Sequence, residues 1–427
     1  MGVRVKLNQF RLYLYIDLLK TPFGKFKPVA YSLLNNYQDE FFILIKGIPY
    51  CCMPDATEHI TYEKSGNKSY HRLKKCARCL HAKDCPGIEN GLKIATLRPI
   101  KDLPKEIVLE LTKSCNQDCP ICNLKKKKDR ALPVKIVKNA LAECESLGIK
   151  KVLFTGGEPL LYEDLVEVLR YAKERGFYVR LNTNASLLNK ELITSIENYV
   201  DNILISLQGY NAKSDMALAG SGNLFLKKIK NIGLVKKSSI PIMRIGTIIS
   251  QTFIKNLLSY YRLIKALGVK RWELYRPMIN TKNSCEYKLT NSDFEKIFEF
   301  IITIRKKGLY LIIGNTIPFC VIKKTLDHPE IFAGNMYDDG HLRLVFDSMG
   351  HIKPSYFIDK TVGNNISDAW NHAFLKKIRS LSYLPQECKK CFYLRWCKGG
   401  SRFLAREHKR SFFATDPLYS PHKEHRL

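Results

Sequence analysis

The sequence of 427 residues predicts an α/β protein with a central parallel β-sheet. Between about residues 106 and 312, short runs rich in β-branched residues alternate with longer segments of helical hydrophobic periodicity. Six such β–α units imply parallel strands that are joined by right-handed crossovers. We expect strands at 106–112, 151–155, 177–182, 202–207, 241–248 and 270–275, and helices at 134–147, 162–175, 189–199, 224–237, 254–267 and 291–306.

The composition is that of an ordinary globular protein, with 45% hydrophobic and 26% charged residues. No uninterrupted apolar stretch reaches the ~18 residues that a membrane-spanning helix needs. The N-terminus carries Arg4, Lys6, Arg11 and Asp17 and lacks the apolar core of a signal peptide. We therefore expect a cytoplasmic protein without a membrane partner. In that setting, fourteen cysteines favour metal or cluster ligation over a disulfide scaffold.

The most informative motif is a group of three cysteines directly after the expected strand 106–112. These are Cys115, Cys119 and Cys122, in the spacing CxxxCxxC. Three thiolates on one loop can bind three irons of a 4Fe–4S cube and leave the fourth iron open for another ligand. A zinc knuckle would instead need two ligand pairs and a closed shell, whereas the next cysteine, Cys144, lies in an expected helix.

Three further short segments follow the next expected strands in order. They are residues 156–159 (GGEP), 181–185 (LNTNA) and 203–209 (ILISLQG). Together with the cysteine loop, they resemble the cluster loop, GGEP, "TNG" and "S-D-G" segments of the radical S-adenosylmethionine (radical SAM) superfamily. The resemblance implies an open (βα)6 partial TIM-type barrel over residues 101–312. In such a barrel all four segments would lie at the C-terminal ends of strands, and therefore at one rim.

The resemblance also implies cofactors and a reaction. The three loop cysteines would hold a 4Fe–4S cluster that cleaves SAM reductively, and the resulting 5′-deoxyadenosyl radical would abstract a hydrogen from the substrate. A one-electron reductant of the ferredoxin or flavodoxin type would supply the electron. The implied SAM contacts are Gly156, Gly157, Glu158, Pro159, Thr183, Asn184 and Ser206. Glycines let a backbone approach a cofactor closely, although strand-end turns and caps use the same residue types.

Two positions depart from the superfamily pattern. Ile121 stands before the third cysteine, where an aromatic residue against the adenine is common, and Ala219 stands where an arginine beside Gly220 is common. Neither change removes an iron ligand. Arg244 or Arg276 could take the place of the missing arginine. No residue stands in a spacing that identifies a general acid or base, so the catalytic residues stay unassigned.

Residues 1–100 are expected to form a separate, cysteine-rich region. Cys76 and Cys79 form a CxxC pair, Cys85 follows closely, and Cys51 and Cys52 lie upstream. One CxxC pair, a third cysteine and a distal fourth make a good ligand set for zinc or for a second iron–sulfur cluster. We favour Cys51 over Cys52 as the distal ligand; reduced structural thiols are the alternative.

Residues 313–427 resemble the SPASM or twitch extension of many peptide-modifying radical SAM enzymes. Cys320, a hairpin around 346–351 and the spacing CxxCx₅C carry the resemblance, the last formed by Cys388, Cys391 and Cys397. Several cysteines of the full module are replaced, namely by Asp339, Ser355, Ser401 and Tyr419. The first auxiliary cluster is therefore expected to be lost. The CxxCx₅C trio could still hold a cluster with Ser420, His422 or a substrate thiol, or join Cys320 around one zinc, or bind no metal.

The formal net charge of +30 leaves the substrate class open. Such an excess arises from solvated lysine faces, or it serves an anionic partner such as an acidic peptide, a small metabolite or RNA. The SPASM-like extension favours a peptide substrate, of the kind made by the ribosome and then matured. RNA or a small anionic metabolite is the alternative, and a non-catalytic cluster- or SAM-binding protein is a third. Nucleic acid is not favoured, because no RNA-recognition motif is present.

Overall fold

The computed structural model describes residues 3–8, 11–16, 23–37, 42–46, 48–53, 60–61, 70–79, 81–82, 85, 87–90, 101–122, 131–220, 224–278, 285–322, 328–332 and 339–420. The chain forms two compact units. One comprises Met1–Asp102 with His328–Glu330, and the other comprises Leu103–Asp327 with Ile331–Leu427. The predicted domain boundaries at 100 and 312 stay predictions. The described residues include no helix that is long and apolar enough to cross a membrane.

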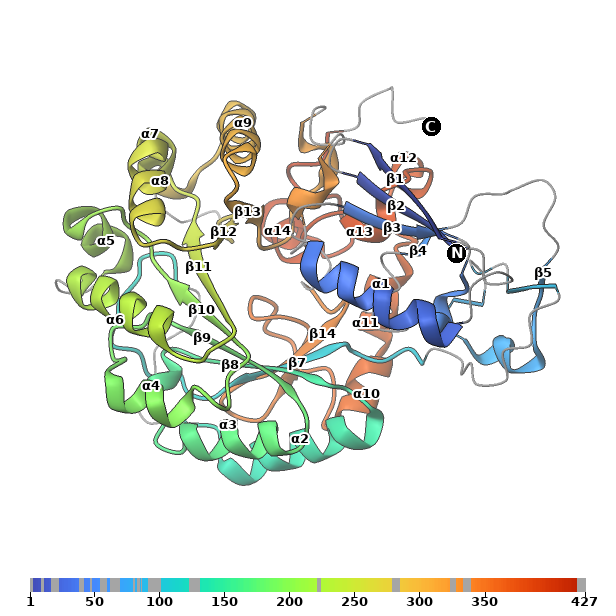
Figure 1. The fold of residues 1–427 in the computed structure, drawn as a ribbon, viewed down its shortest axis with the longest axis horizontal. Coiled ribbons are helices and arrows are strands. Elements are labelled where there is room, and N and C mark those ends of the chain that lie inside the picture. Colours follow the sequence, from blue (N-terminus) through green and yellow to red (C-terminus); the bar gives the residue numbers. More distant parts are fainter. Residues whose placement is uncertain are drawn as a thin grey trace. The chain divides into compact units, whose positions relative to one another are not determined.

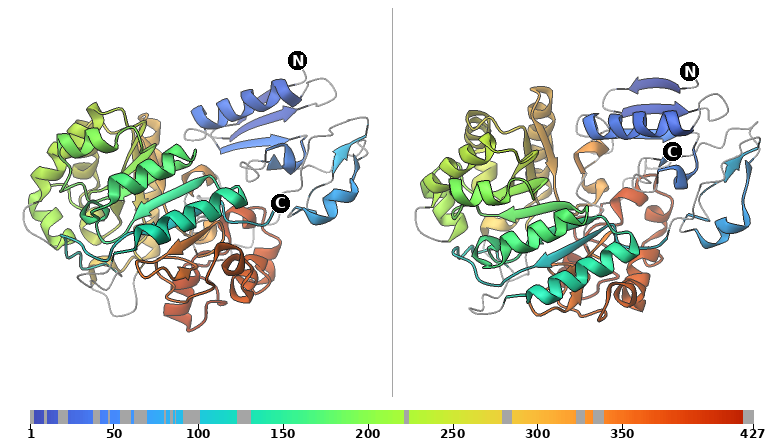
Figure 2. Two further views of the ribbon diagram at one scale, coloured as in Figure 1. Left: turned by 90° about the horizontal axis from the view of Figure 1, so that it is seen from below. Right: turned by 60° about the horizontal axis from the view of Figure 1, so that its bottom comes forward.

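The smaller unit contains a four-stranded sheet in the order β1-β2-β3-β4. Its strands are β1 (Val3–Asn8), β2 (Arg11–Ile16), β3 (Phe42–Lys46) and β4 (Ile60–Thr61). β1 and β2 pair antiparallel, whereas β3 is parallel to β2. A parallel pair needs a crossover, which helix α1 (Phe23–Tyr37) provides, and the helix lies along the sheet (Figure 2). Ala30 and Leu34 of α1 pack with Ile45 in a buried apolar cluster.

The larger unit is built on a nine-stranded sheet in the order β13-β12-β11-β10-β9-β8-β7-β14-β15 (Figure 1). The six predicted strands are all present, and each pairs in parallel with the next. They are β7 (Glu106–Glu110), β8 (Lys151–Thr155), β9 (Tyr178–Thr183), β10 (Asn202–Ser206), β11 (Ile242–Ile248) and β12 (Arg271–Tyr275). The predicted α/β fold class with a parallel barrel-type core is confirmed.

Three strands were not predicted as part of this sheet. β13 (Tyr310–Ile313) pairs in parallel with β12 at one edge, and β14 (Arg343–Phe346) pairs in parallel with β7 at the other. β15 (Ile352–Lys353) then pairs antiparallel with β14 to form the hairpin expected around 346–351. The prediction fell short because edge pairing is a long-range contact, and a four-residue strand carries no local signal for its partner.

Helices cover the outer face of this curved sheet (Figure 1). They are α2 (Val134–Leu147), α3 (Leu165–Glu174), α4 (Lys190–Ile196), α5 (Ala212–Ala219), α6 (Phe225–Lys237), α7 (Gln251–Lys255), α8 (Leu257–Ala266) and α9 (Asn291–Lys306). Two differ from expectation. α5 was not predicted, and the expected helix 254–267 is divided at Asn256 into α7 and α8, with the side chain of Ser250 capping α7.

The inner face of the sheet carries buried charged pairs as well as apolar side chains. Arg180 of β9 donates to Glu106 of β7 at 2.5 Å, and Arg244 of β11 donates to both carboxylate oxygens of Glu273 of β12 at 2.7 Å. Burial alone would raise the pKa of Glu106, but the charge of Arg180 and that of Arg343 lower it below its ordinary value. The Arg244–Glu273 pair joins two neighbouring strands, whereas the Arg180–Glu106 pair reaches across β8. Removing one partner of either pair would leave a buried charge uncompensated.

The C-terminal extension packs on the same unit. It contains α10 (Ile366–Asn371), α11 (Ala373–Ser380), α12 (Gln386–Lys389), α13 (Leu394–Cys397) and α14 (Arg402–Lys409). The carboxylate of Glu143 on α2 accepts hydrogen bonds from the backbone of Ile366 at 2.8 Å and Ser367 at 3.3 Å. A negative charge at the first turn of α10 is favourable there, and this contact fixes the extension to the barrel.

Candidate functional site

The cysteine loop begins directly after β7. The backbone of Cys122 donates to the carbonyl of Cys119 at 2.9 Å, which closes a turn around the last two cysteines. Cys115 and Cys119 are half-buried, and Cys122 is exposed. The backbone of Gln117 donates to the sulfur of Cys115 at 3.4 Å. The loop therefore presents its thiols partly to solvent, at the C-terminal end of the first strand, as predicted from the sequence.

The GGEP segment lies against this loop. The backbone of Gly157 donates to the carbonyl of Thr112 at 2.6 Å, and that of Glu158 donates to the carbonyl of Ser114 at 2.8 Å. A Cβ atom on Gly157 would overlap the carbonyl of Ser114, and one on Gly156 would meet that of Thr112. The two glycines thus allow close backbone contact with the cysteine loop, a role that the sequence analysis did not foresee.

The carboxylate of Glu158 is buried between two strand ends. It accepts hydrogen bonds from the hydroxyl of Thr183 at 2.5 Å, the backbone of Asn184 at 2.7 Å and the backbone of Leu160 at 3.2 Å. Burial raises the pKa of Glu158 to about 7, although these three donors lower it in part. Through these contacts Glu158 braces the loop that carries it. Pro159 is buried in the turn that follows.

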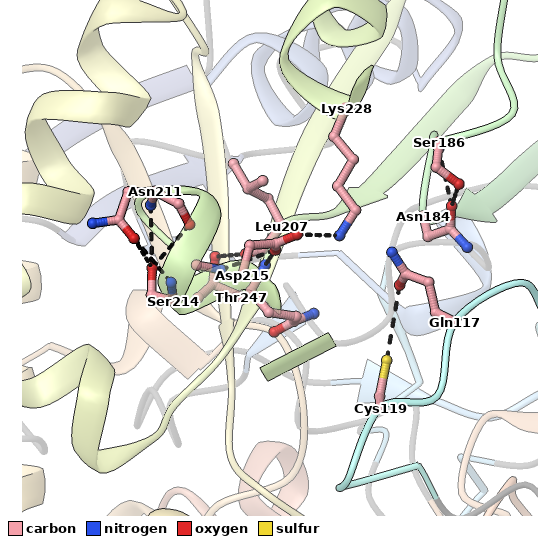
Figure 3. A network of polar contacts seen from close by, with 12 residues as sticks. Gln117, Cys119, Asn184, Ser186, Leu207, Asn211, Ser214, Asp215, Lys228 and Thr247 are labelled. Atoms are coloured by element: carbon pink, nitrogen blue, oxygen red, sulfur yellow. Dashed lines mark hydrogen bonds and ion pairs between the residues drawn. The ribbon is translucent and has the colours of Figure 1, made fainter. Parts of the chain in front are cut away.

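Asn116 connects the cysteine loop to the end of β9. Its side chain donates to the hydroxyl of Ser186 at 2.7 Å and accepts from the amide of Asn184 at 2.8 Å. The hydroxyl of Ser186 also donates to Asn184 at 2.6 Å. Figure 3 shows Asn184 and Ser186 on one side of the loop that bears Gln117 and Cys119. Asn116 was missed in the sequence, where its position between two cysteines was the available signal.

The end of β10 is fixed by a buried ion pair. Lys228 of α6 lies 2.8 Å from Asp215 of α5, and both side chains are buried (Figure 3). The other oxygen of Asp215 accepts from the backbone of Gln208 and Gly209, at 3.1 Å each. Gly220, which ends α5, packs against the cysteine loop so closely that a Cβ would overlap the carbonyl of Asp118. The expected Ser206 ends β10 just before this turn.

A pocket of about 200 Å³ opens at the C-terminal ends of the central strands. Ser206 lines it together with Ile121 of the cysteine loop. The other lining residues come from β10 to β12 and the segments that follow, and include Gln208, Gly246, Ile248, Tyr275, Arg276, Met278 and Phe357. Of the expected SAM contacts, Ser206 lines this pocket. The Gly156–Pro159 segment and the pair Thr183 and Asn184 lie instead in the network that holds the cysteine loop.

The two arginines considered as substitutes for the missing arginine have different surroundings. Arg244 is held by Glu273 and by Asn202 in the barrel interior. Arg276 lines the pocket, but its guanidinium donates to both carboxylate oxygens of Asp416, at 2.9 and 3.0 Å. Both arginines therefore already have carboxylate partners, and Arg276 is the one that reaches the pocket.

The four cysteines of the C-terminal extension lie in one neighbourhood. Burial raises the pKa of Cys388 to about 12, and the negative charges of Cys320 and Cys391 raise it further. The same causes act on Cys397, where burial comes first and Cys320 and Cys388 contribute. Cys397 is buried, and the other three are half-buried. Cys320 thus lies near Cys388 and Cys397, and the single-zinc alternative stays a prediction.

Two of the residues that replace cysteines in this extension bond to each other. The hydroxyl of Ser401 donates to the carboxylate of Asp339 at 3.0 Å, and the backbone of Arg402 donates to the same oxygen at 2.6 Å. The buried guanidinium of Arg402 donates to backbone carbonyls, including those of Gly399 at 2.6 Å and Ala414 at 2.6 Å. Hydrogen bonds therefore tie together the segments that carry these replacements.

The N-terminal cysteines also lie near one another. Burial raises the pKa of Cys51 to about 11, and the charges of Cys85, Cys79 and Cys76 act in the same direction. Cys52 is fully buried in the apolar cluster of the small sheet. All fourteen cysteines are among the described residues, and none is in a disulfide. In the described part of the chain, no three Cys, His, Asp or Glu side chains are arranged to hold one metal ion.

Comparison with known proteins identifies the core. Residues 109–255 match the model of the radical SAM superfamily. An AdoMet-dependent heme synthase of Methanosarcina barkeri is 23% identical over 69% of this chain and 90% of its own length. A PqqA peptide cyclase of Gluconobacter oxydans is 23% identical over 74% of this chain and 90% of its own length. The fold is similar to that of Streptococcus suis SuiB bound to the precursor peptide SuiA, with a TM-score of 0.60, 20% identity and 77% coverage of both chains.

The matched segment contains the cysteine loop, the GGEP segment and the ends of β9, β10 and β11. Residues 109–255 therefore form a radical SAM domain, and the chain is an enzyme that carries this domain. Its cofactors are a 4Fe–4S cluster and SAM, as in the superfamily.

Proposed function

We propose that this chain modifies a peptide by radical SAM chemistry, with Cys115, Cys119 and Cys122 as the ligands of its 4Fe–4S cluster. When bound, the cluster and SAM supply a 5′-deoxyadenosyl radical that abstracts a hydrogen atom from the substrate. The observation that carries the proposal is the convergence at one end of the sheet of the cysteine loop, its hydrogen-bonded neighbours and the pocket.

The residues at this edge fit such a cluster. Three thiols on one loop provide three ligands and no fourth, which suits a cube with one open iron. The loop is held from two sides, by the backbone of Gly157 and Glu158 and by the side-chain contacts of Asn116. Because these contacts use backbone and neutral polar groups, they position the thiols without placing a competing ligand beside them.

For SAM we propose a binding region between the cysteine loop and the pocket. Ser206 and Ile121 line the pocket, and Ile121 lies directly before the proposed cluster ligand Cys122. Glu158 and Asn184 are engaged by neighbouring residues, so their proposed role is to shape the loop that faces the cofactor. Glycines at 156 and 157 let the GGEP segment lie directly against the backbone of the cysteine loop.

A peptide substrate is supported by two relatives. The curated PqqA peptide cyclase matches most of this chain, and the similar SuiB structure contains a precursor peptide. The SPASM-like extension is also present, with its hairpin paired to the first barrel strand. We propose a ferredoxin- or flavodoxin-type protein as the electron donor, because the net charge of +30 favours association with an acidic partner.

A small anionic substrate is the second candidate. It is favoured by the similarity to an AdoMet-dependent heme synthase, which spans nearly as much of this chain. Arg276 in the pocket wall is a cationic group that could approach such a substrate, although Asp416 pairs with it.

The test uses full-length protein that is purified and reconstituted without oxygen. Dithionite and SAM should yield 5′-deoxyadenosine, and Cys119→Ala should yield none, whereas Cys285→Ala, which changes an exposed cysteine outside all three sets, should match the wild type. Peptides encoded by small open reading frames beside the gene are then compared with tetrapyrroles as substrates. A SAM-dependent mass change on a peptide supports the proposal, and one on a tetrapyrrole alone contradicts it.

A further inference from the structure

The described residues between 70 and 90 of the N-terminal unit belong to a long loop, and few of them have apolar packing. β5 (Tyr70–His71) and β6 (Ile88–Glu89) pair antiparallel and close the loop, but each strand has only two residues. Ile88 is buried and Leu73 is half-buried against the apolar cluster of the small sheet. Segments this poor in apolar contacts are usually held by disulfides or a metal.

Three cysteines lie inside that loop and are positioned by backbone contacts. Cys76 and Cys79 lie at a 3₁₀ turn, where the backbone of Cys79 donates to the carbonyl of Cys76 at 3.0 Å. The backbone of Cys85 donates to the carbonyl of His81 at 2.9 Å. The guanidinium of Arg72 donates to the carbonyl of Cys85 at 2.7 and 3.2 Å. The loop is therefore folded back on itself around its cysteines.

A fourth cysteine comes from the other side of the same unit. Cys51 and Cys85 both pack on the apolar cluster that contains Ile45 and Ile88. The ring of Tyr50, next to Cys51, stacks on that of His81 with centroids 4.1 Å apart. This stacking joins the two cysteine-bearing segments at a second point, independent of the thiols.

The neighbour Cys52 has a different environment. Its side chain is fully buried within the apolar cluster, whereas Cys51 is half-buried and lies near the three loop cysteines. The sequence preference for Cys51 over Cys52 is thus supported by their burial.

We propose that Cys51, Cys76, Cys79 and Cys85 bind one thiophilic metal centre, a zinc ion or a 4Fe–4S cluster, that holds the N-terminal unit together. Four thiolates complete the shell of either centre, so no position stays open for a substrate. The side chains would turn inward on binding, since no three of the described ligand side chains are yet arranged around one ion. Metal binding would release the thiol protons and stabilise the loop, as in other small metal-bound domains.

The centre is tested by metal analysis of the full chain after anaerobic purification. Zinc and iron per chain are measured for the wild type, Cys51→Ser and Cys79→Ser. Cys285→Ser, on the surface of the larger unit, is the matched control, and Cys52→Ala tests the neighbouring position. We expect Cys51→Ser and Cys79→Ser to lose either one zinc or the four irons of one cluster, and both control variants to keep the wild-type content. Visible absorbance distinguishes the two centres, because only the iron cluster is coloured.

Two further measurements distinguish a defect at this site from a defect at the radical SAM site. Trypsin should cut the Cys79→Ser variant within residues 70–90 faster than it cuts the wild type, because Lys74 and Arg78 lie on either side of the proposed ligand Cys76. Formation of 5′-deoxyadenosine by the same variant would show that its larger unit is folded. Unchanged zinc and iron in both ligand variants would overturn the proposal. Equal metal loss in Cys52→Ala and Cys51→Ser would also overturn the proposed ligand set.

Discussion

The cysteine loop after β7 and the cysteines of the C-terminal extension are both rich in thiols, but their surroundings differ. In the loop, Cys115 and Cys119 are half-buried and Cys122 is exposed, and the contacts around them come from glycines, Asn116 and other polar groups. In the extension, Cys397 is buried, and Phe319 and Tyr393, which flank the thiols in sequence, are buried and pack with ring centroids 5.7 Å apart.

This difference relates burial to the chemistry each site can support. A radical SAM cluster must leave one iron accessible, and a loop of three thiols at a strand end beside a pocket provides that access. Four clustered thiols among aromatic side chains suit a closed, structural centre instead. Burial is the main cause of the raised pKa values of the Cys388 and Cys397 thiols, and neighbouring cysteines raise them further.

The largest effect is expected from losing a ligand of the open cluster. Cys119→Ala should abolish 5′-deoxyadenosine formation, because two thiolates cannot hold the cube with a single open iron. The product is measured by chromatography after anaerobic incubation with SAM and dithionite. If this variant formed as much 5′-deoxyadenosine as the wild type, the cysteine loop would not hold the cluster that cleaves SAM. The proposed difference between this loop and the cysteines of the C-terminal extension would then be wrong.

A smaller but still strong effect is expected where the GGEP segment contacts the loop. In Gly157→Ala the new Cβ overlaps the backbone carbonyl of Ser114, which cannot rotate away, so we expect a loss of about 1–3 kcal/mol in stability and lower iron occupancy. The control is Gly233→Ala inside α6, where no atom lies within 4 Å of the added Cβ. Replacing that helical glycine should stabilise the protein by about 0.4–1 kcal/mol. Denaturant unfolding and iron analysis measure both, and equal effects of the two changes would contradict the close contact.

Much of the fold followed from the sequence, because periodicity and motif order are local signals. The six strands and the positions of the cysteine loop and the GGEP segment at strand ends were predicted in this way. The contacts of Gly156 and Gly157 were not predicted, because tertiary structure brings the backbone carbonyls that they touch close to them. The buried pair of Asp215 and Lys228 was also missed, because charged residues 13 positions apart on separate helices give no pattern in the sequence.

The ion pairs of Arg244 and Arg276 also show that long-range contacts could not be predicted from the sequence. Both Arg244 and Arg276 were considered as cofactor ligands on residue type alone. The structure pairs Arg244 with Glu273, one strand away, and Arg276 with Asp416, which lies 140 residues later in the C-terminal extension. Only tertiary structure reveals which charges are already compensated, so sequence reasoning could name candidates but could not choose between them.

A moderate, pH-dependent effect is expected at Glu158. Because burial raises its pKa from 4.5 to about 7, the folded protein binds this proton more tightly than the unfolded chain. The stabilisation is complete below about pH 4.5 and is lost as pH rises through about 7, by up to about 3 kcal/mol. Glu158→Gln removes the titration, so wild-type stability relative to this variant should fall between pH 5 and pH 8.

Urea unfolding of both proteins at the two pH values measures this change. Glu174→Gln, a substitution on the exposed surface of α3, is the control and should show no such trend relative to the wild type. A constant stability difference between the wild type and Glu158→Gln would mean that the carboxyl does not titrate in this range. It would also mean that the bracing of the GGEP segment is independent of pH.

The smallest effect on SAM cleavage is expected from the C-terminal cysteines. Cys391→Ala should leave 5′-deoxyadenosine formation without substrate within about twofold of the wild type, because this thiol belongs to the C-terminal extension and not to the loop beside the pocket. If the extension holds zinc or iron, the same variant should lose it, as measured per chain, and Cys320→Ala should lose it equally if all four thiols share one centre. Retention of metal in Cys320→Ala but not in Cys391→Ala would instead assign the centre to the CxxCx₅C trio with another ligand. Loss of SAM cleavage in Cys391→Ala would show that the two cysteine regions act together, against the separation of open and closed sites argued here.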